Sequence, residues 1–128
     1  MKVAIAGKGG VGKTTIAATL ARLLGRDGLT VLAIDADPAM NLALALGISP
    51  AVAKRIVPIS DNPDLIEERT GARPGETSGA VFNLTPRVED LASKFGVPAP
   101  DSTRLLVLGT VKSAGSGCMC PANALLRA

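Results

Sequence analysis

Apolar residues along the chain form several short runs and one longer helical pattern. Three of the runs are short, aliphatic and end at glycine or at polar residues. Runs of this kind are typical of the buried strands of a parallel sheet. We therefore predict strands at Lys2–Ala6, Thr30–Ile34 and Leu105–Leu108.

A helical pattern follows the first predicted strand. From Lys13 onward, apolar residues recur at i, i+4, i+7 and i+8 with alanines between them, and Gly25 and Gly28 offer an end. Strand, glycine loop, helix and strand together indicate a βαβ unit. This unit predicts an α/β fold with a mostly parallel sheet and flanking helices. The recurring apolar residues are Ile16, Leu20, Leu23 and Leu24.

Capping residues, prolines and glycines predict the remaining elements. A flexible loop is expected at about residues 71–80 and a glycine- and serine-rich turn at residues 109–117, after which Cys118 opens a last helix. The other predicted helices are Met40–Leu46 (N-cap Asp37, end Gly47), Pro63–Thr70 (end Gly71), and Thr85–Pro86 onward to an end at Gly96.

The amino-acid composition excludes several classes of function. The sequence has no His, Trp or Tyr, which excludes His-ligated zinc, a His-based acid–base relay and an aromatic platform for nucleic-acid bases. Its 14 Lys and Arg against 11 Asp and Glu give a net charge of +3, too mild to indicate nucleic acid. No apolar run approaches the roughly 18 residues of a membrane span, and no signal-peptide pattern is present. We expect a cytoplasmic protein with no membrane or nucleic-acid partner.

The segment Gly7–Thr14 fits G-x-x-x-x-G-K-[ST], the phosphate-binding loop. Glycines let the backbone approach phosphate oxygens, and the N–H groups that open a helix favour an anion. Lys13 is suited to neutralise β- and γ-phosphate charge, and the Thr14 hydroxyl to ligate Mg²⁺. A glycine-rich turn without a ligand is the alternative, but the predicted strand and helix on either side favour ATP. The residues assigned to the nucleotide are Gly9, Gly10, Val11, Gly12, Lys13, Thr14 and Thr15.

Two aspartates follow the second predicted strand, at the edge where open α/β sheets bind ligands. Because side chains alternate along an extended segment, Asp35 and Asp37 cannot point the same way. One of them could hold a Mg²⁺-bound water while the other faces the γ-phosphate. The alternative is that Asp37 only caps the next helix ahead of Pro38. A cap and a catalytic role are compatible.

Cys118 and Cys120 are the only cysteines in the sequence. A helix start at this position favours the thiolate form, and soft thiolates suit zinc, nickel, copper(I) or an iron–sulfur cluster. One chain offers two sulfurs and no His, so a four-thiolate site would need two chains. Two reduced cysteines without a metal are the alternative.

Lys8 is a second lysine that the standard loop pattern does not require. With it, Lys8–Thr14 resembles the deviant Walker A motif of the MinD, ParA and nitrogenase iron protein superfamily. The resemblance implies that Lys8 acts catalytically on the nucleotide of a partner subunit; a solvated loop lysine is the alternative. The aspartate segment then resembles switch I of that superfamily. This implies that Asp37 orients or activates the attacking water and that Asp35 supports the magnesium.

Further segments resemble the CooC-type ATPases, which help to insert nickel into carbon monoxide dehydrogenase. The resemblance runs from residue 8 through residue 42, resumes at 82–88 and 106–112 and ends with 117–127, so that it covers most of the chain, and the last segment is the most discriminating. It implies a homodimer controlled by ATP and Mg²⁺, with Ni²⁺ or Zn²⁺ held between two subunits by Cys118 and Cys120. Carbon monoxide dehydrogenase would be the client enzyme.

The predicted strands are fewer than the about five that a doubly wound sheet needs. We therefore predict that residues 1–128 form a single, partial P-loop nucleotide-binding domain, truncated after about half of the fold. Switch II and the base-recognition residues would follow Ala128. Three alternative functions stay open: a metal-free partitioning or cell-division ATPase, an electron-transfer ATPase like the nitrogenase iron protein, and a nucleotide-binding fragment that does not hydrolyse ATP.

Overall fold

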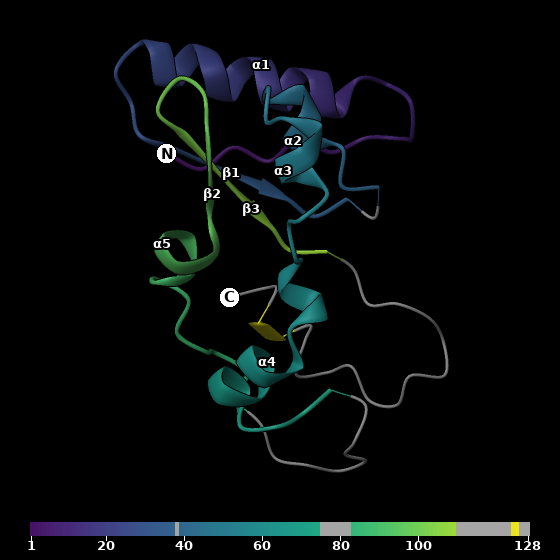
Figure 1. The fold of residues 1–128 in the computed structure, drawn as a ribbon, viewed down its shortest axis with the longest axis vertical. Coiled ribbons are helices and arrows are strands. Elements are labelled where there is room, and N and C mark those ends of the chain that lie inside the picture. Colours follow the sequence, from purple (N-terminus) through teal and green to yellow (C-terminus); the bar gives the residue numbers. More distant parts are fainter. Residues whose placement is uncertain (38, 75–82, 110–123, 126–128) are drawn as a thin grey trace.

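A three-stranded sheet with helices packed on it organises the chain (Figure 1). The computed structural model describes residues 1–37, 39–74, 83–109 and 124–125. Strand β1 (Val31–Asp35) pairs in parallel with β3 (Thr103–Val107), and β2 (Val97–Ala99) pairs antiparallel with β3, giving the order β1-β3-β2. Two of the predicted strands, near residues 30–34 and 105–108, are thus confirmed, and the sheet is mixed.

The predicted N-terminal strand is wrong. Residues 2–6 form no strand and no backbone hydrogen bond with any other described residue, and Val3 is 57% exposed. A strand exists only where a neighbouring backbone satisfies its N–H and C=O groups, and an apolar run does not reveal whether that neighbour is present. The βαβ unit predicted at the N-terminus is therefore not formed in the described part of the chain. The parallel pair is β1 and β3.

Strand β2 is absent from the predicted elements, and its sequence, Val97-Pro98-Ala99, contains a proline. Proline has no N–H for the ladder, which argues against a strand in the middle of a sheet. The position of β2 at one edge of the sheet explains why Pro98 is tolerated there.

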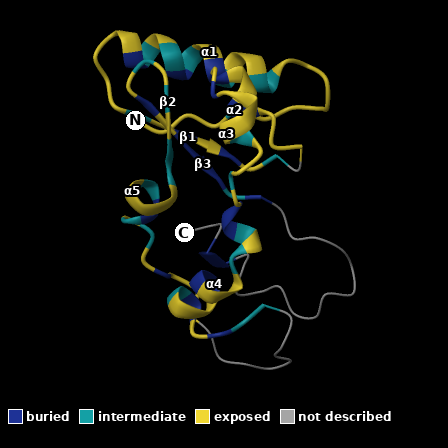
Figure 2. Cartoon of the chain, in the orientation of Figure 1, coloured by how far each residue is buried: buried dark blue, intermediate teal, exposed yellow. Residues whose placement is uncertain are grey.

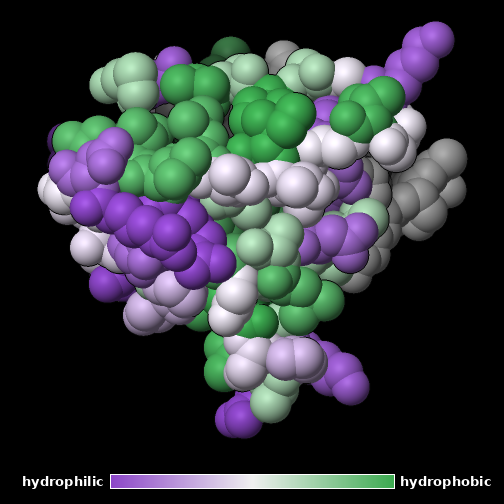
Figure 3. Space-filling view, turned by 90° about the horizontal axis from the view of Figure 1, so that it is seen from above, coloured by the Kyte–Doolittle hydropathy of each residue, from purple (hydrophilic) through white to green (hydrophobic). Residues whose placement is uncertain are grey.

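Helix α1 (Lys13–Arg26) confirms the predicted helix. The residues that it buries, however, are small ones rather than its large apolar ones. Its buried residues are Ala18, Ala21 and Gly25. Ile16 is 57% exposed and Leu23 is 52% exposed. Figure 2 shows exposed positions along this helix, and Figure 3, which looks down onto it, shows hydrophobic residues on the outer surface. Small side chains let the helix lie close to the elements beneath it.

The shorter helices agree with the prediction in part. Helix α4 (Pro63–Thr70) has the predicted bounds, and Gly71 ends it in a left-handed conformation with φ 80°. Its N-cap is Asn62, whose side chain accepts a hydrogen bond from the Leu65 N–H. Two unpredicted elements are α3 (Pro50–Ala53) and the 3₁₀ helix η1 (Ile59–Asp61). For α3, the Ser49-Pro50 pair was a usable start signal.

Two predicted helix starts are wrong. Helix α2 (Leu42–Ala45) begins after Asn41, because Met40 has φ 47° and interrupts a right-handed helix. Helix α5 (Leu91–Phe95) begins well after Thr85, whose N–H donates to the Asn83 side chain in a local turn. The predicted ends at Gly47 and Gly96 hold.

Some predictions lie outside the described residues. These are most of the predicted loop at 71–80, the turn after Gly109, Pro38 as a first-turn residue, and the helix opening at Cys118. Within the described part, no helix is both long enough and apolar enough to cross a membrane.

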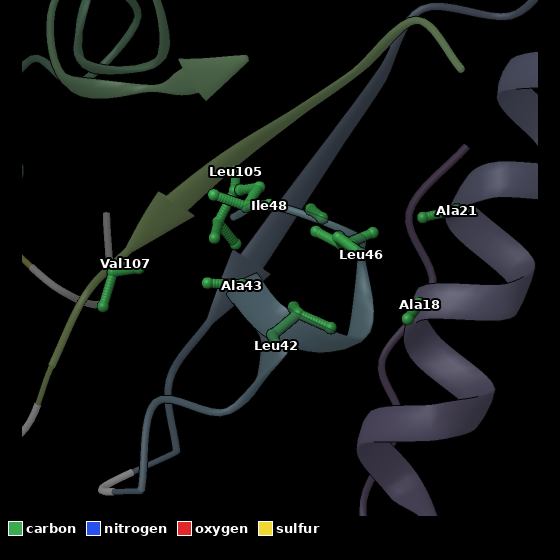
Figure 4. Packing of buried hydrophobic residues seen from close by; sticks show 9 residues of the cluster. Ala18, Ala21, Leu42, Ala43, Leu46, Ile48, Leu105 and Val107 are labelled. Atoms are coloured by element: carbon green, nitrogen blue, oxygen red, sulfur yellow. The ribbon is translucent and has the colours of Figure 1, made fainter. Parts of the chain in front are cut away.

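Two apolar clusters form the core. The first joins α1, the α2 region and the sheet, and Figure 4 shows how its side chains converge between these elements. The second packs α4, η1 and α5 against Leu106 and Leu125. The first cluster fixes the start of α1 and the end of β1 next to each other. Its buried members are Ala18, Ala21, Ala33, Leu42, Ala43, Leu46, Ile48, Leu105 and Val107.

Candidate nucleotide site

The glycine loop before α1 adopts backbone conformations that require glycine. Gly10 has φ 79° and Gly12 has φ 90°, both in the left-handed region that other residues rarely adopt. Gly12 is the N-cap of α1, and no side chain caps this helix end. The N–H groups of the first turn are therefore left without a side-chain acceptor, which is the arrangement that binds an anion.

Lys13 folds back over this loop. Its Nζ donates a hydrogen bond of 3.0 Å to the backbone carbonyl of Lys8. The ammonium group is thereby held beside the loop, where phosphate oxygens would meet it. The Lys8 side chain is exposed and has no ion pair or hydrogen bond with another residue in the described ranges.

A hollow of about 380 Å³ lies beside the loop and the end of β1. It brings together four of the predicted site residues: Lys13, Thr14, Asp35 and Asp37. Lys8, Thr15 and the stretch 9–12 do not line it, although they belong to the same loop and helix start. The remaining lining is Ile5, Gly7, Ala17, Ile34, Ala36 and Leu42.

The two aspartates at the end of β1 are held differently. Asp35 is only 4% exposed, and its Oδ1 and Oδ2 accept hydrogen bonds of 3.0 Å from the N–H groups of Asp37 and Leu42. Asp37 is partly exposed, and its Oδ1 accepts a hydrogen bond of 2.9 Å from the Ala39 N–H. Asp37 thus caps a tight turn rather than helix α2, whose N-cap is Asn41, and it is one of the residues that line the hollow.

The donor set suits a nucleotide with magnesium. The backbone N–H groups of the loop and the Lys13 ammonium are suited to phosphate, whereas the Thr14 hydroxyl and the aspartate oxygens are the hard ligands that Mg²⁺ prefers. In the described part of the chain, no cluster of three or more His, Cys, Asp and Glu residues is arranged to hold a metal by itself. Cys118 and Cys120 lie outside the described residues.

Sequence reasoning missed a second hollow of about 320 Å³. It is mainly apolar and carries one charged residue, Lys54. Ala39 and Met40 contribute to it, so one segment after β1 borders both hollows. No motif marks such a hollow in sequence, because it forms where α2, α3 and Val107 meet.

An ion pair with two parallel hydrogen bonds lies outside the lining of both hollows. Arg69 of α4 donates two hydrogen bonds, of 2.9 and 2.7 Å, to the Asp90 carboxylate, and Lys94 lies 2.7 Å from the same group. Hydrogen bonding to Arg69, and then to Lys94, holds the pKa of Asp90 well below its ordinary value. Neither hollow includes these residues. We therefore infer that the ion pair has a structural role and holds α4 against the start of α5.

Comparison with known proteins identifies the family. Residues 2–120 match the CobQ/CobB/MinD/ParA nucleotide binding domain. The chain is 52% identical to an uncharacterized ATP-binding protein of Methanocaldococcus jannaschii, over 99% of this chain and 47% of the relative. It is 50% identical to the carbon monoxide dehydrogenase accessory protein CooC of Rhodospirillum rubrum, again over 99% of this chain and 47% of the relative.

A more distant relative shares the same region. The ATPase get3 of Schizosaccharomyces japonicus is 31% identical over 90% of this chain and 37% of the relative. The chain spans about half the length of its two most similar relatives named here. The P-loop fold class and the resemblance to the CooC-type ATPases are thus confirmed. The chain belongs to the CobQ/CobB/MinD/ParA nucleotide-binding domain family.

Proposed function

We propose that this chain is the ATP-binding part of an ATPase that assists nickel insertion into carbon monoxide dehydrogenase. The observation that carries the proposal is the hollow in which Lys13, Thr14 and Asp37 converge. The 50% identity to CooC over nearly the whole chain supports the choice of client enzyme. The reduced thiols that the metal chemistry needs are in keeping with a cytoplasmic protein.

The proposed reaction is in-line attack of water on the γ-phosphate of ATP. Residues 9–15 bind the phosphates, and Lys13 stabilises the charge that develops on the transferred group. Asp37 orients the attacking water, and Lys8 acts on the nucleotide of a partner subunit. Mg²⁺, when bound, neutralises part of the phosphate charge.

Of the two predicted magnesium residues, Thr14 has the freer oxygen. Both carboxylate oxygens of Asp35 already accept backbone hydrogen bonds. We therefore assign direct contact with the metal to Thr14 and a supporting negative charge to Asp35.

The proposed cargo site needs two copies of the chain. Cys118 and Cys120 supply two thiolates, and the sequence has no His to complete a tetrahedral site. A homodimer would supply four thiolates, which suit Ni²⁺ or Zn²⁺. ATP would bring the two cysteine pairs together, and hydrolysis would separate them and release the metal to the client.

The ATPase proposal is tested with Lys13→Ala in the full-length protein that carries this chain. Removal of the ammonium should lower ATP turnover by at least about a hundredfold. Lys2→Ala is the matched control, because Lys2 is exposed and lies outside the hollow. Wild-type turnover in the Lys13 variant would refute the proposal.

The cargo proposal is tested by the metal-to-protein ratio under reducing conditions. Wild type and the Cys118→Ser/Cys120→Ser variant are loaded with Ni²⁺ or Zn²⁺, with and without ATP and Mg²⁺, and the oligomeric state is recorded. One metal per two chains, lost in the variant, is the expected result. A metal-free dimer that forms equally well in the cysteine variant would instead favour a MinD- or ParA-type partitioning ATPase. Nucleotide binding without turnover would identify a non-hydrolysing module.

A further inference from the structure

Asp35 is a buried acidic residue whose side chain is occupied by the chain's own backbone. Its Oδ1 accepts the Asp37 N–H and its Oδ2 accepts the Leu42 N–H, each at 3.0 Å. Hydrogen bonds to a carboxylate are stronger than bonds between neutral groups. One side chain thus spans the turn after β1 and joins its first part to the first residue of α2.

The turn between β1 and α2 makes few other hydrogen bonds. For the described residues 36, 37, 39 and 40, the other hydrogen bonds stay inside the turn: Ala39 N–H to the Asp37 carboxylate and Met40 N–H to the Asp37 carbonyl. Met40 is held at φ 47°, a conformation that costs a non-glycine residue free energy. The two hydrogen bonds to Asp35 are therefore the described side-chain contacts that tie this turn to the elements on either side of it.

The strand end behind Asp35 is itself fixed. The Asp35 carbonyl accepts a hydrogen bond of 2.9 Å from the Leu108 N–H, which extends the pairing of β1 with β3. The Leu42 side chain is buried in the first core cluster. The Asp35 carboxylate thus connects two rigid elements, and between them stands the turn that presents Asp37 to the hollow.

We propose that Asp35 is a positioning residue: it holds the turn so that Asp37 faces the γ-phosphate, and it acts on the reaction through Asp37 rather than as a magnesium ligand. The inference rests on the proposed ATPase function. Misplacement of a reacting group by about 1 Å costs up to a hundredfold in rate, so loss of this support should lower turnover markedly.

A double-variant experiment tests whether Asp35 acts through Asp37. Asp35→Asn replaces one acceptor oxygen by an NH₂ group, which cannot accept a backbone N–H bond. In the full-length protein, Asp35→Asn should lower kcat by about tenfold or more and leave KM for ATP unchanged. Asp37→Asn should lower kcat further, and the double variant should match Asp37→Asn alone. Asp27→Asn, at the exposed end of α1, is the matched control and should behave as wild type.

The Mg²⁺ dependence separates positioning from coordination. In the Asp35→Asn variant, the Mg²⁺ concentration at half-maximal rate should rise by no more than about fivefold, because the supporting charge is lost but no residue in direct contact with the metal is. A large rise in that concentration, or losses in kcat that multiply in the double variant, would overturn the inference.

Amide hydrogen exchange gives a readout that needs no catalysis. In Asp35→Asn, the N–H groups of Asp37 and Leu42 should exchange about tenfold faster, while the Leu105 N–H in β3 keeps its protection. Unchanged exchange at Leu42, or equal loss of protection in β3, would overturn the inference. If the wild type hydrolyses no ATP, the proposed function fails, and this measurement still decides whether Asp35 holds the turn.

Discussion

The two ends of α1 differ in how they are secured. At its N-terminus, Gly12 is the cap, no side chain closes the first turn, and the preceding loop is exposed. At its C-terminus, Gly25 is buried against the turn between β2 and β3, and Asp101 of that turn accepts from Arg22 at 2.7 Å and pairs with Arg26 at 3.2 Å. The helix is thus anchored at the end far from the candidate site. This leaves the dipole and the free N–H groups of the other end available for a phosphate.

The turn that anchors the helix has a specific backbone shape. Asp101 has φ 59° and Ser102 has φ 52°, so both central residues are left-handed, as in the tight turns favoured between antiparallel strands. This shape brings the Asp101 carbonyl against Gly25: a Cβ added there would lie 1.6 Å from the carbonyl oxygen. The contact is possible only because residue 25 is a glycine.

The largest expected effect on stability is that of Gly25→Ala. The new methyl group meets a backbone carbonyl, so the helix or the turn must move. We expect a loss of about 3 kcal/mol or more in the free energy of unfolding, measured by urea denaturation. A loss below about 1 kcal/mol would show that the C-terminal end of α1 is not tightly held.

Gly12→Ala tests the other end of the same helix. A Cβ there meets nothing within 4 Å, so the cost comes only from φ 90° and should be about 1–2 kcal/mol. ATP binding should weaken by more than about tenfold, because the loop must shift to relieve the strain. Isothermal titration beside denaturation separates the two effects. If Gly12→Ala were as destabilising as Gly25→Ala, the contrast between the ends would fail.

Helix α4 differs from α1 in that the side chain of its N-cap residue accepts a hydrogen bond from the first turn. Asn62→Ala removes the acceptor of the Leu65 N–H and should cost about 1 kcal/mol in unfolding free energy. ATP affinity should stay at the wild-type value, because Asn62 does not line the hollow. A fall in ATP affinity in this variant would mean that helix stability in general, rather than the open start of α1, controls binding.

The smallest expected effect concerns the ion pairs of Asp101. Hydrogen bonding to Arg22, and then to Arg26, lowers the pKa of the Asp101 carboxyl below its ordinary value of 3.8. A lowered folded-state pKa means that the stabilisation is present above pH 3.8 and is lost as the pH falls through and below it. Asp101→Asn should lower Tm by a few degrees at neutral pH and flatten the fall in Tm below about pH 4. An unchanged acid slope in the variant would assign that slope to other carboxylates.

Local signals predicted some parts of this fold well. Helix α4 has a proline at its first position and a glycine after its last, and both signals act within the helix itself. The run at residues 2–6 has an equally clear pattern but forms no strand, because a strand depends on a distant partner. The start of α2 was misplaced because nothing in the sequence marks Met40 for a left-handed conformation.

The candidate site likewise has features that follow from local sequence and features that depend on the assembled fold. The sequence motif places Lys13 and Thr14 at the start of a helix, and both line the hollow, while their contact with phosphate stays a prediction. The hydrogen bond from Leu42 to Asp35 was not predictable, because it depends on where α2 begins relative to the end of β1. The apolar hollow bordered by Met40 and Lys54 likewise requires the assembled fold.

The small residues on the buried face of α1 decide which substitutions this helix can accept. Ala18 and Ala21 are 3% and 6% exposed, while the larger Ile16 and Leu23 face outward. Side-chain volume, rather than hydrophobicity, is therefore what limits variation on the inner face: an added methylene there must displace the sheet or the helix. In a library of random variants of the described chain, serine at residue 18 should survive more often than leucine, an order opposite to that expected for most core positions.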